Sequence, residues 1–299
     1  MPTVTTPTLE ISFDREGPKD GLTIILLHGW PDDSLAWRQV LPPLHAAGYA
    51  TVTPNLRGYG ATRFRSAATP RSAQVSALAQ DVLDLADALG IARFAVVGHD
   101  WGARAAYAAA ALWPERVSHC VSMAVGWGNF GEPTQDLSLE QARNYWYQWY
   151  LGTPHGQYQL EQERRSFTRF LWESWGPSLD WFTDAEFEAT AESFENPDWT
   201  TVVLHYYRHR WGLAEGDPRY DALEARLAPT PSITVPTLLL QGGADECTVP
   251  TTTEGRQRFF SAPYERIVIP DVGHFLPREA PQAVARAITE FLGGWGDRL

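Results

Sequence analysis

A segment near the middle of the chain, Val96-Val-Gly-His-Asp-Trp-Gly-Ala103, constrains the fold more than any other. An apolar run leads into it, and an Ala-rich stretch that favours a helix follows it through Ala111. Gly98 and Gly102 flank Asp100 at two residues on either side, and glycines at this spacing permit a tight, strained turn. The segment therefore predicts a strand followed at once by a helix, with the Asp100 side chain pushed out between them.

Aspartate at the tip of this turn suits one kind of chemistry. The Asp100 carboxylate needs no deprotonation at neutral pH, and the N-terminus of the following helix helps to keep it ionised. A carboxylate that attacks carbon forms an ester intermediate. The alternative is structural, because aspartate is a common N-cap residue and Asp100 could merely cap the Ala-rich helix.

Short apolar runs alternate with amphipathic stretches along the chain, apart from one long interruption. The runs that we predict as buried strands are Thr23–Leu27, Ala50–Thr53, Phe94–Val97, Val117–Ala124, Thr237–Leu240 and Ile267–Ile269. Apolar residues at helical spacing occur in Val75–Leu89 and Ala280–Leu292. Continuous apolar strands that alternate with helices are typical of a parallel sheet buried on both faces. We therefore expect an α/β fold, with a mostly parallel sheet covered by helices on both faces.

The interruption, from about residue 128 to residue 226, shows helical patterns and no strand signal. Much of the aromatic content lies there, with seven of the 13 Trp and six of the 11 Tyr between about residues 140 and 212. The helices that we predict are approximately Leu139–Leu151, Gly156–Trp175, Asp184–Phe194 and Pro197–Trp211. We expect a core made of residues 1–127 and 227–299, interrupted by a helical insertion at 128–226.

Composition and charge exclude several classes of function. The net charge of −12, from 24 basic and 36 acidic residues, repels nucleic acids and anionic lipids. The two cysteines, Cys120 and Cys247, cannot form a disulfide framework, and neither lies in a CxxC pair. The N-terminal residues lack the apolar segment of a secretory signal, and no apolar run is long enough to cross a bilayer. We expect an intracellular protein that binds neither nucleic acid nor membrane.

Five segments, taken in their order along the chain, resemble the α/β-hydrolase fold. They are His28-Gly-Trp-Pro31, Arg57-Gly-Tyr-Gly60, Gly98-His-Asp-Trp-Gly102, the loop at Asp245, and Gly273-His274. Within that fold they are similar to the branch with an aspartate nucleophile, which includes epoxide hydrolases and haloalkane and fluoroacetate dehalogenases. The resemblance covers the whole chain, and it implies that the helical insertion is a cap, or lid, domain.

The resemblance implies a role for each of five residues. Asp100 would be the nucleophile, and His274 would activate the water that hydrolyses the ester. Asp245 would orient His274 and stabilise its charged form. The backbone N–H groups of Trp30 and Trp101 would form the oxyanion hole, the pair of donors that stabilises the charge of the tetrahedral intermediate.

Other residues of these segments have alternative or simpler interpretations. Glu246, beside Asp245, is a second candidate for the acid, and His274 could instead be a loop histidine that caps the last helix. We interpret His28, Arg57 and Arg104 as structural.

Tyrosines of the insertion suit the opening of an epoxide, because a phenol stays protonated at neutral pH and donates well to an alkoxide. Epoxide hydrolases carry one cap tyrosine in a segment similar to Trp146-Tyr-Gln148, and a second immediately before an arginine. The resemblance therefore implies Tyr147 and Tyr207. Tyr150 and Tyr206 remain competitors. The aromatic residues could also simply line an apolar pocket.

We therefore predict an epoxide hydrolase that uses water to convert a small hydrophobic epoxide to a vicinal diol. We expect a cytoplasmic monomer or homodimer that needs no cofactor or metal. The main alternative is a dehalogenase of haloalkanes or haloacetates with the same nucleophile and base. It is disfavoured because Trp30 stands where haloalkane dehalogenases often have Asn, and Trp101 where fluoroacetate dehalogenases have Arg. A ligand-binding module without turnover is a third hypothesis, and an aspartate nucleophile disfavours an esterase.

Overall fold

The computed structural model describes residues 1–128 and 137–296, so residues 129–136 of the predicted insertion lie outside the described residues. Within the described part, nine strands form one sheet in the order β1-β2-β4-β3-β6-β7-β8-β9, and β5 pairs with β2. Neighbouring strands from β4 to β9 are parallel, whereas β1, β2 and β5 pair antiparallel. The strands are β1 (Thr3–Thr5), β2 (Leu9–Glu16), β3 (Thr23–Leu27), β4 (Ala50–Pro54), β5 (Arg63–Phe64), β6 (Phe94–His99), β7 (Val117–Met123), β8 (Thr237–Gly242) and β9 (Tyr264–Ile269). The predicted mostly parallel sheet is confirmed.

All six predicted apolar runs form strands of the parallel sheet, and all but the last begin at the predicted residue. Successive side chains in β3 and β6 face two different apolar clusters. Ile25, Leu27 and Val96 belong to one cluster, and Ile24 and Leu26 to the other. Because a strand sends successive side chains to opposite faces, a sheet covered on both faces needs the continuous apolar runs seen here.

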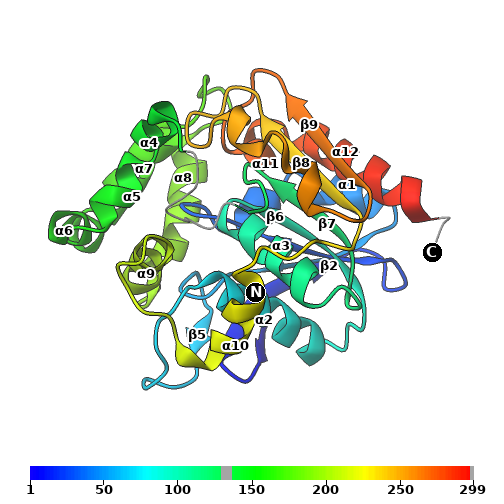
Figure 1. The fold of residues 1–299 in the computed structure, drawn as a ribbon, viewed down its shortest axis with the longest axis horizontal. Helices are drawn as coiled ribbons and strands as arrows, with labels where there is room; N and C mark the ends of the chain where they lie inside the picture. Colours follow the sequence, from blue (N-terminus) through cyan, green and yellow to red (C-terminus); the bar gives the residue numbers. More distant parts are fainter. Residues whose placement is uncertain (129–136, 297–299) are drawn as a thin grey trace.

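Core helices cover the two faces of the sheet (Figure 1). Helices α2 (Val75–Ala88) and α3 (Trp101–Leu112) contribute to the first cluster, and α1 (Leu41–Ala46) and α12 (Pro281–Gly296) to the second. Helix α3 packs against β6 and β7, two central strands. The turn from β6 to α3 therefore lies at the carboxyl edge of the sheet, where α/β proteins place their ligands.

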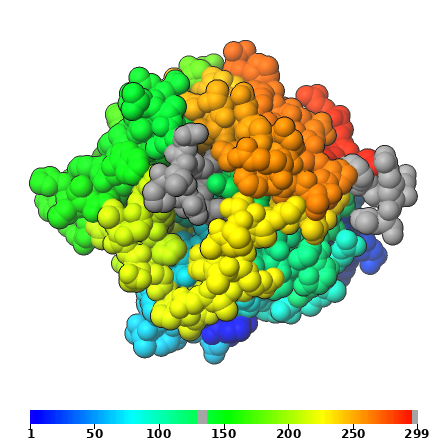
Figure 2. Space-filling view, viewed as in Figure 1, coloured from blue at the N-terminus to red at the C-terminus, as the bar shows by residue number. Residues whose placement is uncertain are grey.

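Six helices of the insertion gather at one end of the molecule, on the left of Figure 1, and form the green and yellow-green lobe on the left of Figure 2. They are α4 (Leu139–Asn144), α5 (Trp146–Leu151), α6 (Pro154–Gln162), α7 (Arg164–Ser174), α8 (Asp184–Ala191) and α9 (Trp199–Arg210). Two of the long helices that we predicted are each divided. The backbone leaves the helical conformation at Tyr145 and at Glu163, so α4 is separate from α5, and α6 from α7.

We propose that residues 128–226 form a cap domain, within which no strand occurs between residues 137 and 226. The last helix of that range, α10 (Asp221–Leu227), packs against α2 and α3 of the core. Among the described residues, no helix combines the length and the apolar character needed to span a bilayer.

Arg278, on the short helix α11 (Leu276–Glu279), connects the core to the insertion. Its Nε and Nη2 atoms donate to the Asp32 carboxylate at 2.9 and 2.6 Å. The same guanidinium donates to Glu186 Oε2 and Thr190 Oγ1 of α8, at 3.1 and 2.8 Å. It also lies over the Trp172 ring of α7. These contacts hold the helices of the insertion beside the loop that carries His274.

Candidate active site

The turn between β6 and α3 holds Asp100 in an unusual backbone conformation. Its φ of 50° and ψ of −113° lie outside the regions that non-glycine residues normally adopt. Neighbouring backbone atoms leave no room for a side chain at either flanking glycine, Gly98 or Gly102. A Cβ atom on Gly98 would collide with the Gly102 carbonyl, and one on Gly102 with the Leu27 carbonyl. The structure therefore contains the strained turn that the sequence predicts, with aspartate at its tip.

The Asp100 carboxylate is largely buried and lies between a backbone donor and a histidine. Oδ1 accepts a hydrogen bond from the backbone N–H of Trp30 at 2.9 Å. Oδ2 lies 3.9 Å from Nε2 of His274. Within the described residues the side chain makes no capping hydrogen bond to α3, so the alternative of a simple helix cap has no support.

Asp245 and His274 form a buried pair. His274 Nδ1 lies 2.9 Å from Asp245 Oδ2, and as the donor it leaves Nε2 directed towards Asp100. Asp245 Oδ1 accepts hydrogen bonds from the backbone N–H groups of Cys247 and Thr248, at 2.8 and 2.7 Å. Glu246 is exposed, so it is Asp245 and not its neighbour that reaches His274.

Two opposing effects set the pKa of His274. Burial favours the neutral ring, but the hydrogen bond and charge of Asp245, followed by the charges of Asp100 and Glu279, outweigh it and raise the pKa. His99 Nε2 donates to the His274 backbone carbonyl at 2.8 Å. Burial and the nearby His274 lower the pKa of His99 to about 4, so His99 stays neutral and positions the loop.

Tyr147 from α5 and Tyr207 from α9 meet above Trp30. Their ring centroids are 5.3 Å apart in an edge-to-face arrangement. Each ring also packs on the Trp30 indole, at 5.5 Å for Tyr147 and 5.3 Å for Tyr207. Because the Trp30 N–H binds Asp100, the two phenols and the carboxylate all contact the same residue. Burial raises the pKa of both phenols well above 10, with smaller contributions that include the charge of Asp100, so both stay protonated.

Each phenol oxygen accepts a hydrogen bond from a nitrogen donor. The indole Nε1 of Trp101 donates to the Tyr207 hydroxyl at 3.2 Å. Nε2 of Gln148 donates to the Tyr147 hydroxyl at 2.8 Å. Trp101 is also the first residue of α3, directly after Asp100, so its backbone N–H belongs to the unpaired helix start where an oxyanion hole is expected.

The competing tyrosines lie in different surroundings. Tyr150 is partly exposed and packs against the rings of Trp146 and Phe167. Tyr206 is buried and stacks on Trp101, with ring centroids 4.4 Å apart. Neither ring packs on the Trp30 indole among the described ring contacts, whereas Tyr147 and Tyr207 both do. This difference favours Tyr147 and Tyr207 as the phenols of the site.

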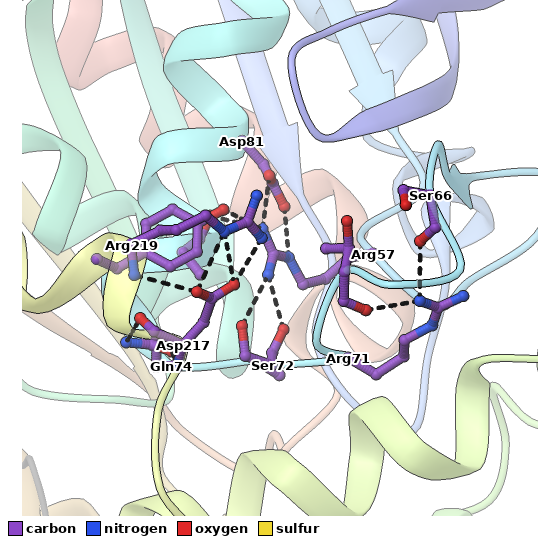
Figure 3. Close-up of polar contacts among 12 residues, drawn as sticks. Arg57, Ser66, Arg71, Ser72, Gln74, Asp81, Asp217 and Arg219 are labelled. Atoms are coloured by element: carbon purple, nitrogen blue, oxygen red, sulfur yellow. Dashed lines mark hydrogen bonds and ion pairs between the residues drawn. The ribbon is translucent and has the colours of Figure 1, made fainter.

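Two basic residues that we interpreted as structural have structural partners. Nδ1 of His28 donates to the Gly29 carbonyl at 2.9 Å, while Nε2 accepts from the Leu56 N–H at 3.1 Å, and burial lowers the pKa of the ring to about 4. Arg57 forms an ion pair with Asp81 of α2 at 2.7 Å (Figure 3).

Two cavities lie beside residues of the candidate site, one at Trp101 and one at Asp245. One, of about 320 Å³, is lined by Trp101, Tyr206 and the buried Arg104, whose guanidinium lies over the Trp101 ring. The other, of about 400 Å³, lies along the Asp245 loop and is lined by Trp175.

One group of potential metal ligands occurs among the described residues: Asp245, Cys247 and His274, whose ligand atoms lie within 4.8 Å of one another. The chemistry of these atoms fits a hydrogen-bonded pair better than a metal site. His274 Nδ1 is already bonded to Asp245, and burial raises the pKa of the Cys247 thiol well above 9. A protonated thiol is a poor metal ligand.

Several residues of the site had no assigned role in the sequence analysis. Gln148 lies in a quoted segment, and only its neighbour was given a role. Gln241 Nε2 reaches Asp245 Oδ2 at 3.3 Å. The Trp175 ring contacts His274 and Tyr147, with centroids 5.1 and 4.9 Å away. Nothing in the local sequence around Trp175 predicts these contacts, since they depend on how α7 docks.

Residues 23–281 match a protein family described as the alpha/beta hydrolase fold. The chain belongs to the alpha/beta hydrolase family. This hydrolase is 27% identical to epoxide hydrolase A of Mycobacterium tuberculosis, over 97% of its own length and 96% of the relative. It is 28% identical to epoxide hydrolase 3 of Xenopus tropicalis, over 95% of its own length and 75% of the relative.

A solved structure is more similar still. This hydrolase is 39% identical to a Klebsiella pneumoniae protein provisionally described as an epoxide hydrolase, with a TM-score of 0.92 and coverage of 100% of this chain and 97% of the other. The predicted fold family and the predicted resemblance to epoxide hydrolases are both confirmed.

Proposed function

We propose that this hydrolase converts a small hydrophobic epoxide to a vicinal diol through an ester of Asp100. One observation carries the proposal: two buried, protonated phenols pack on Trp30, whose N–H binds the candidate nucleophile. The epoxide hydrolases among its relatives support the same reaction. A cytoplasmic location and a monomeric or homodimeric state stay predictions of the sequence.

In the first step, Oδ2 of Asp100 attacks an epoxide carbon and the carbon–oxygen bond of the ring breaks. Oδ1 is the oxygen held by the Trp30 N–H, so it becomes the carbonyl oxygen of the ester. Tyr147 and Tyr207 donate to the departing ring oxygen, and one of them transfers its proton. The product of this step is a hydroxyalkyl ester and a phenolate.

In the second step, His274 Nε2 takes a proton from water and the resulting hydroxide adds to the ester carbonyl. The N–H groups of Trp30 and Trp101 stabilise the charge on Oδ1, an effect worth about 3 kcal/mol per donor in such sites. The intermediate collapses, the alkoxide takes the proton from His274, and the diol leaves. The acidic proton left on Asp100 returns to the phenolate, so the net reaction is epoxide plus water to diol.

Ester formation also prepares the base for the second step. The charge of Asp100 is one of the contributions that raise the pKa of His274. An ester is neutral, so this contribution disappears when the intermediate forms. The pKa of His274 then falls, and the neutral ring that accepts a proton from water is favoured.

The same contacts disfavour a dehalogenase. The Trp101 indole N–H, the expected halide donor, is bonded to the Tyr207 hydroxyl instead. Displacement of a halide needs no proton, so two buried phenols would have no task in that reaction.

The test is a single turnover in ¹⁸O-labelled water, run on a panel of epoxides, haloalkanes and fluoroacetate. We expect an unlabelled diol from an epoxide, with the label in the Asp100 carboxylate. The double variant Tyr147→Phe/Tyr207→Phe should lose about a hundredfold or more of the epoxide activity, because no acid remains. Label in the diol would exclude the ester, and halide release that survives both substitutions would support a dehalogenase.

A further inference from the structure

Gln148 occupies a buried position between Tyr147 and a second cap helix. It is 4% exposed and follows Tyr147 on α5. Its Nε2 donates to the Tyr147 hydroxyl at 2.8 Å, and its Oε1 accepts from the indole Nε1 of Trp211 at 3.0 Å. Trp211 directly follows α9, the helix that carries Tyr207.

The Trp211 contact determines which way the Gln148 amide points. An indole N–H is a donor only, so the amide oxygen of Gln148 must face Trp211. The amide NH₂ group must then face Tyr147, where it can only donate. The hydroxyl oxygen of Tyr147 is therefore an acceptor in this bond, and the phenol proton has to point elsewhere.

Within the described residues, two further groups lie near the Tyr147 hydroxyl: Sγ of Cys247, at 3.5 Å, and the Tyr207 hydroxyl, which is close enough to share a hydrogen bond. Tyr207 donates to the same substrate oxygen in the proposed reaction, so a proton shared between the two phenols stays where the epoxide opens. Sulfur is a weak hydrogen-bond partner as donor or acceptor. It offers little competition for the phenol proton once the oxygen of an opening epoxide arrives. Tyr207 is arranged in the same way, since its hydroxyl oxygen accepts from Trp101.

We propose that Gln148 is a positioning residue, which the Trp211 indole holds in the orientation that directs the Tyr147 proton towards the substrate oxygen. This inference rests on the proposed function, because it assigns that proton to an epoxide. Gln148 touches neither the substrate nor the nucleophile in this scheme. It acts only through Tyr147.

The variant Gln148→Glu tests the direction of the bond with almost no change in size. A carboxylate can still accept from Trp211. It also accepts from the O–H of Tyr147, and so draws the phenol proton away from the substrate oxygen. We expect ester formation to slow by about tenfold to a hundredfold. Hydrolysis of the ester by His274 should change by less than about twofold, because that step does not use the Tyr147 proton.

The two rates are separable by stopped-flow tryptophan fluorescence with the panel epoxide that the wild type turns over fastest. Two results distinguish orientation from simple damage. In a Tyr147→Phe background, Gln148→Glu should have little further effect, because the group it acts on is gone. In the single variant, ester formation should recover at low pH, where the new carboxyl group is protonated and can donate again.

Gln148→Leu is the second variant, since it can neither donate nor accept. It should slow ester formation without recovery at low pH. The proposal is overturned if Gln148→Glu slows the reaction equally with and without Tyr147, or if both variants form the ester at the wild-type rate. If the wild type forms no ester with any epoxide, the proposed function fails, and this inference fails with it.

Discussion

The charge of His274 depends on a few neighbouring groups rather than on its exposure. Burial alone would lower the pKa of this ring, and the adjacent Asp245 reverses the direction of the shift. Asp245 is itself held by the backbone N–H groups of Cys247 and Thr248. At the scale of single residues, the loop that carries Asp245 therefore determines the pH range in which His274 is neutral and can accept a proton.

This dependence gives a prediction for the variant Asp245→Asn. The wild-type rate of ester hydrolysis should fall as the pH drops through the pKa that His274 has in the ester, where the charge of Asp100 is gone but Asp245 still raises the pKa. Without the carboxylate charge, burial dominates and the acid limb should move to lower pH. The plateau rate should fall by about a hundredfold or more, because the ring loses the partner that fixes its tautomer. Single-turnover hydrolysis from about pH 5 to pH 9 measures both effects, and an acid limb that stays in place would contradict the assignment.

Some roles in the candidate site could be predicted from the sequence, and others could not. Asp100, His274 and Asp245 lie in short segments whose resemblance to the α/β-hydrolase fold implied that they act together. The orientation of Gln148 depends on Trp211, 63 residues further along the chain. No local pattern contains such a contact, so the direction of this hydrogen bond needed the structure.

Among the elements, the turn from β6 to α3 carries backbone strain at the candidate nucleophile. Asp100 is held at a positive φ between two glycines that cannot be replaced without a backbone collision. Strain of this kind costs on the order of 1 to 3 kcal/mol and persists only where the surrounding structure enforces it. Here the packing of α3 against β6 and β7 enforces it.

We predict that Asp100→Gly is more stable than Asp100→Asn and inactive. Glycine adopts the positive φ without steric cost, so its free energy of unfolding should exceed that of the Asn variant by about 1 kcal/mol. Asparagine keeps the shape of the side chain and the strain, which makes it the matched control. Urea unfolding of the two variants gives the difference, and equal stabilities would show that the turn is not strained.

The elements that sequence predicted best are those whose signal is local. The continuous apolar runs of β3 and β6 begin at the predicted residues. A strand buried on both faces is apolar at every position, so it can be recognised from its own sequence without knowledge of its neighbours. The antiparallel strands β1, β2 and β5 were not predicted. Strands β1 and β5 are only three and two residues long, so they carry little apolar signal. Strand β2 pairs with β1, β4 and β5, but its eight residues include the charged Glu10, Asp14, Arg15 and Glu16. The breaks at Tyr145 and Glu163 were also missed, since neither residue is proline or glycine.

In the whole molecule, the site forms only where core and insertion meet. The core supplies Asp100, Asp245 and His274, and the insertion supplies Tyr147 and Tyr207. Convergence within the core was predictable, because parallel strands end at one edge of the sheet. The way the insertion docks on that edge was not, since it depends on contacts such as those of Arg278 with Glu186 and Thr190.

We predict that Arg278→Met destabilises the protein by about 3 to 5 kcal/mol, because it leaves the buried Asp32 carboxylate without its cation. Glu186→Gln removes a partly exposed partner of the same arginine and should cost less than about 1 kcal/mol. Denaturant unfolding measures both changes. Faster amide hydrogen exchange in α8 of the Met variant would show that docking of the insertion is what weakens, and unchanged exchange would refute this role for Arg278.

The separate origins of the proposed nucleophile and the proposed proton donors bear on how chains of this kind diversify. Substitutions in α5 and α9 can reshape the chamber and alter which oxirane carbon is attacked, while the carboxylate and its base remain as they are. In the proposed reaction, ring opening therefore depends on both stretches of the polypeptide, whereas the base for ester hydrolysis comes from the core alone.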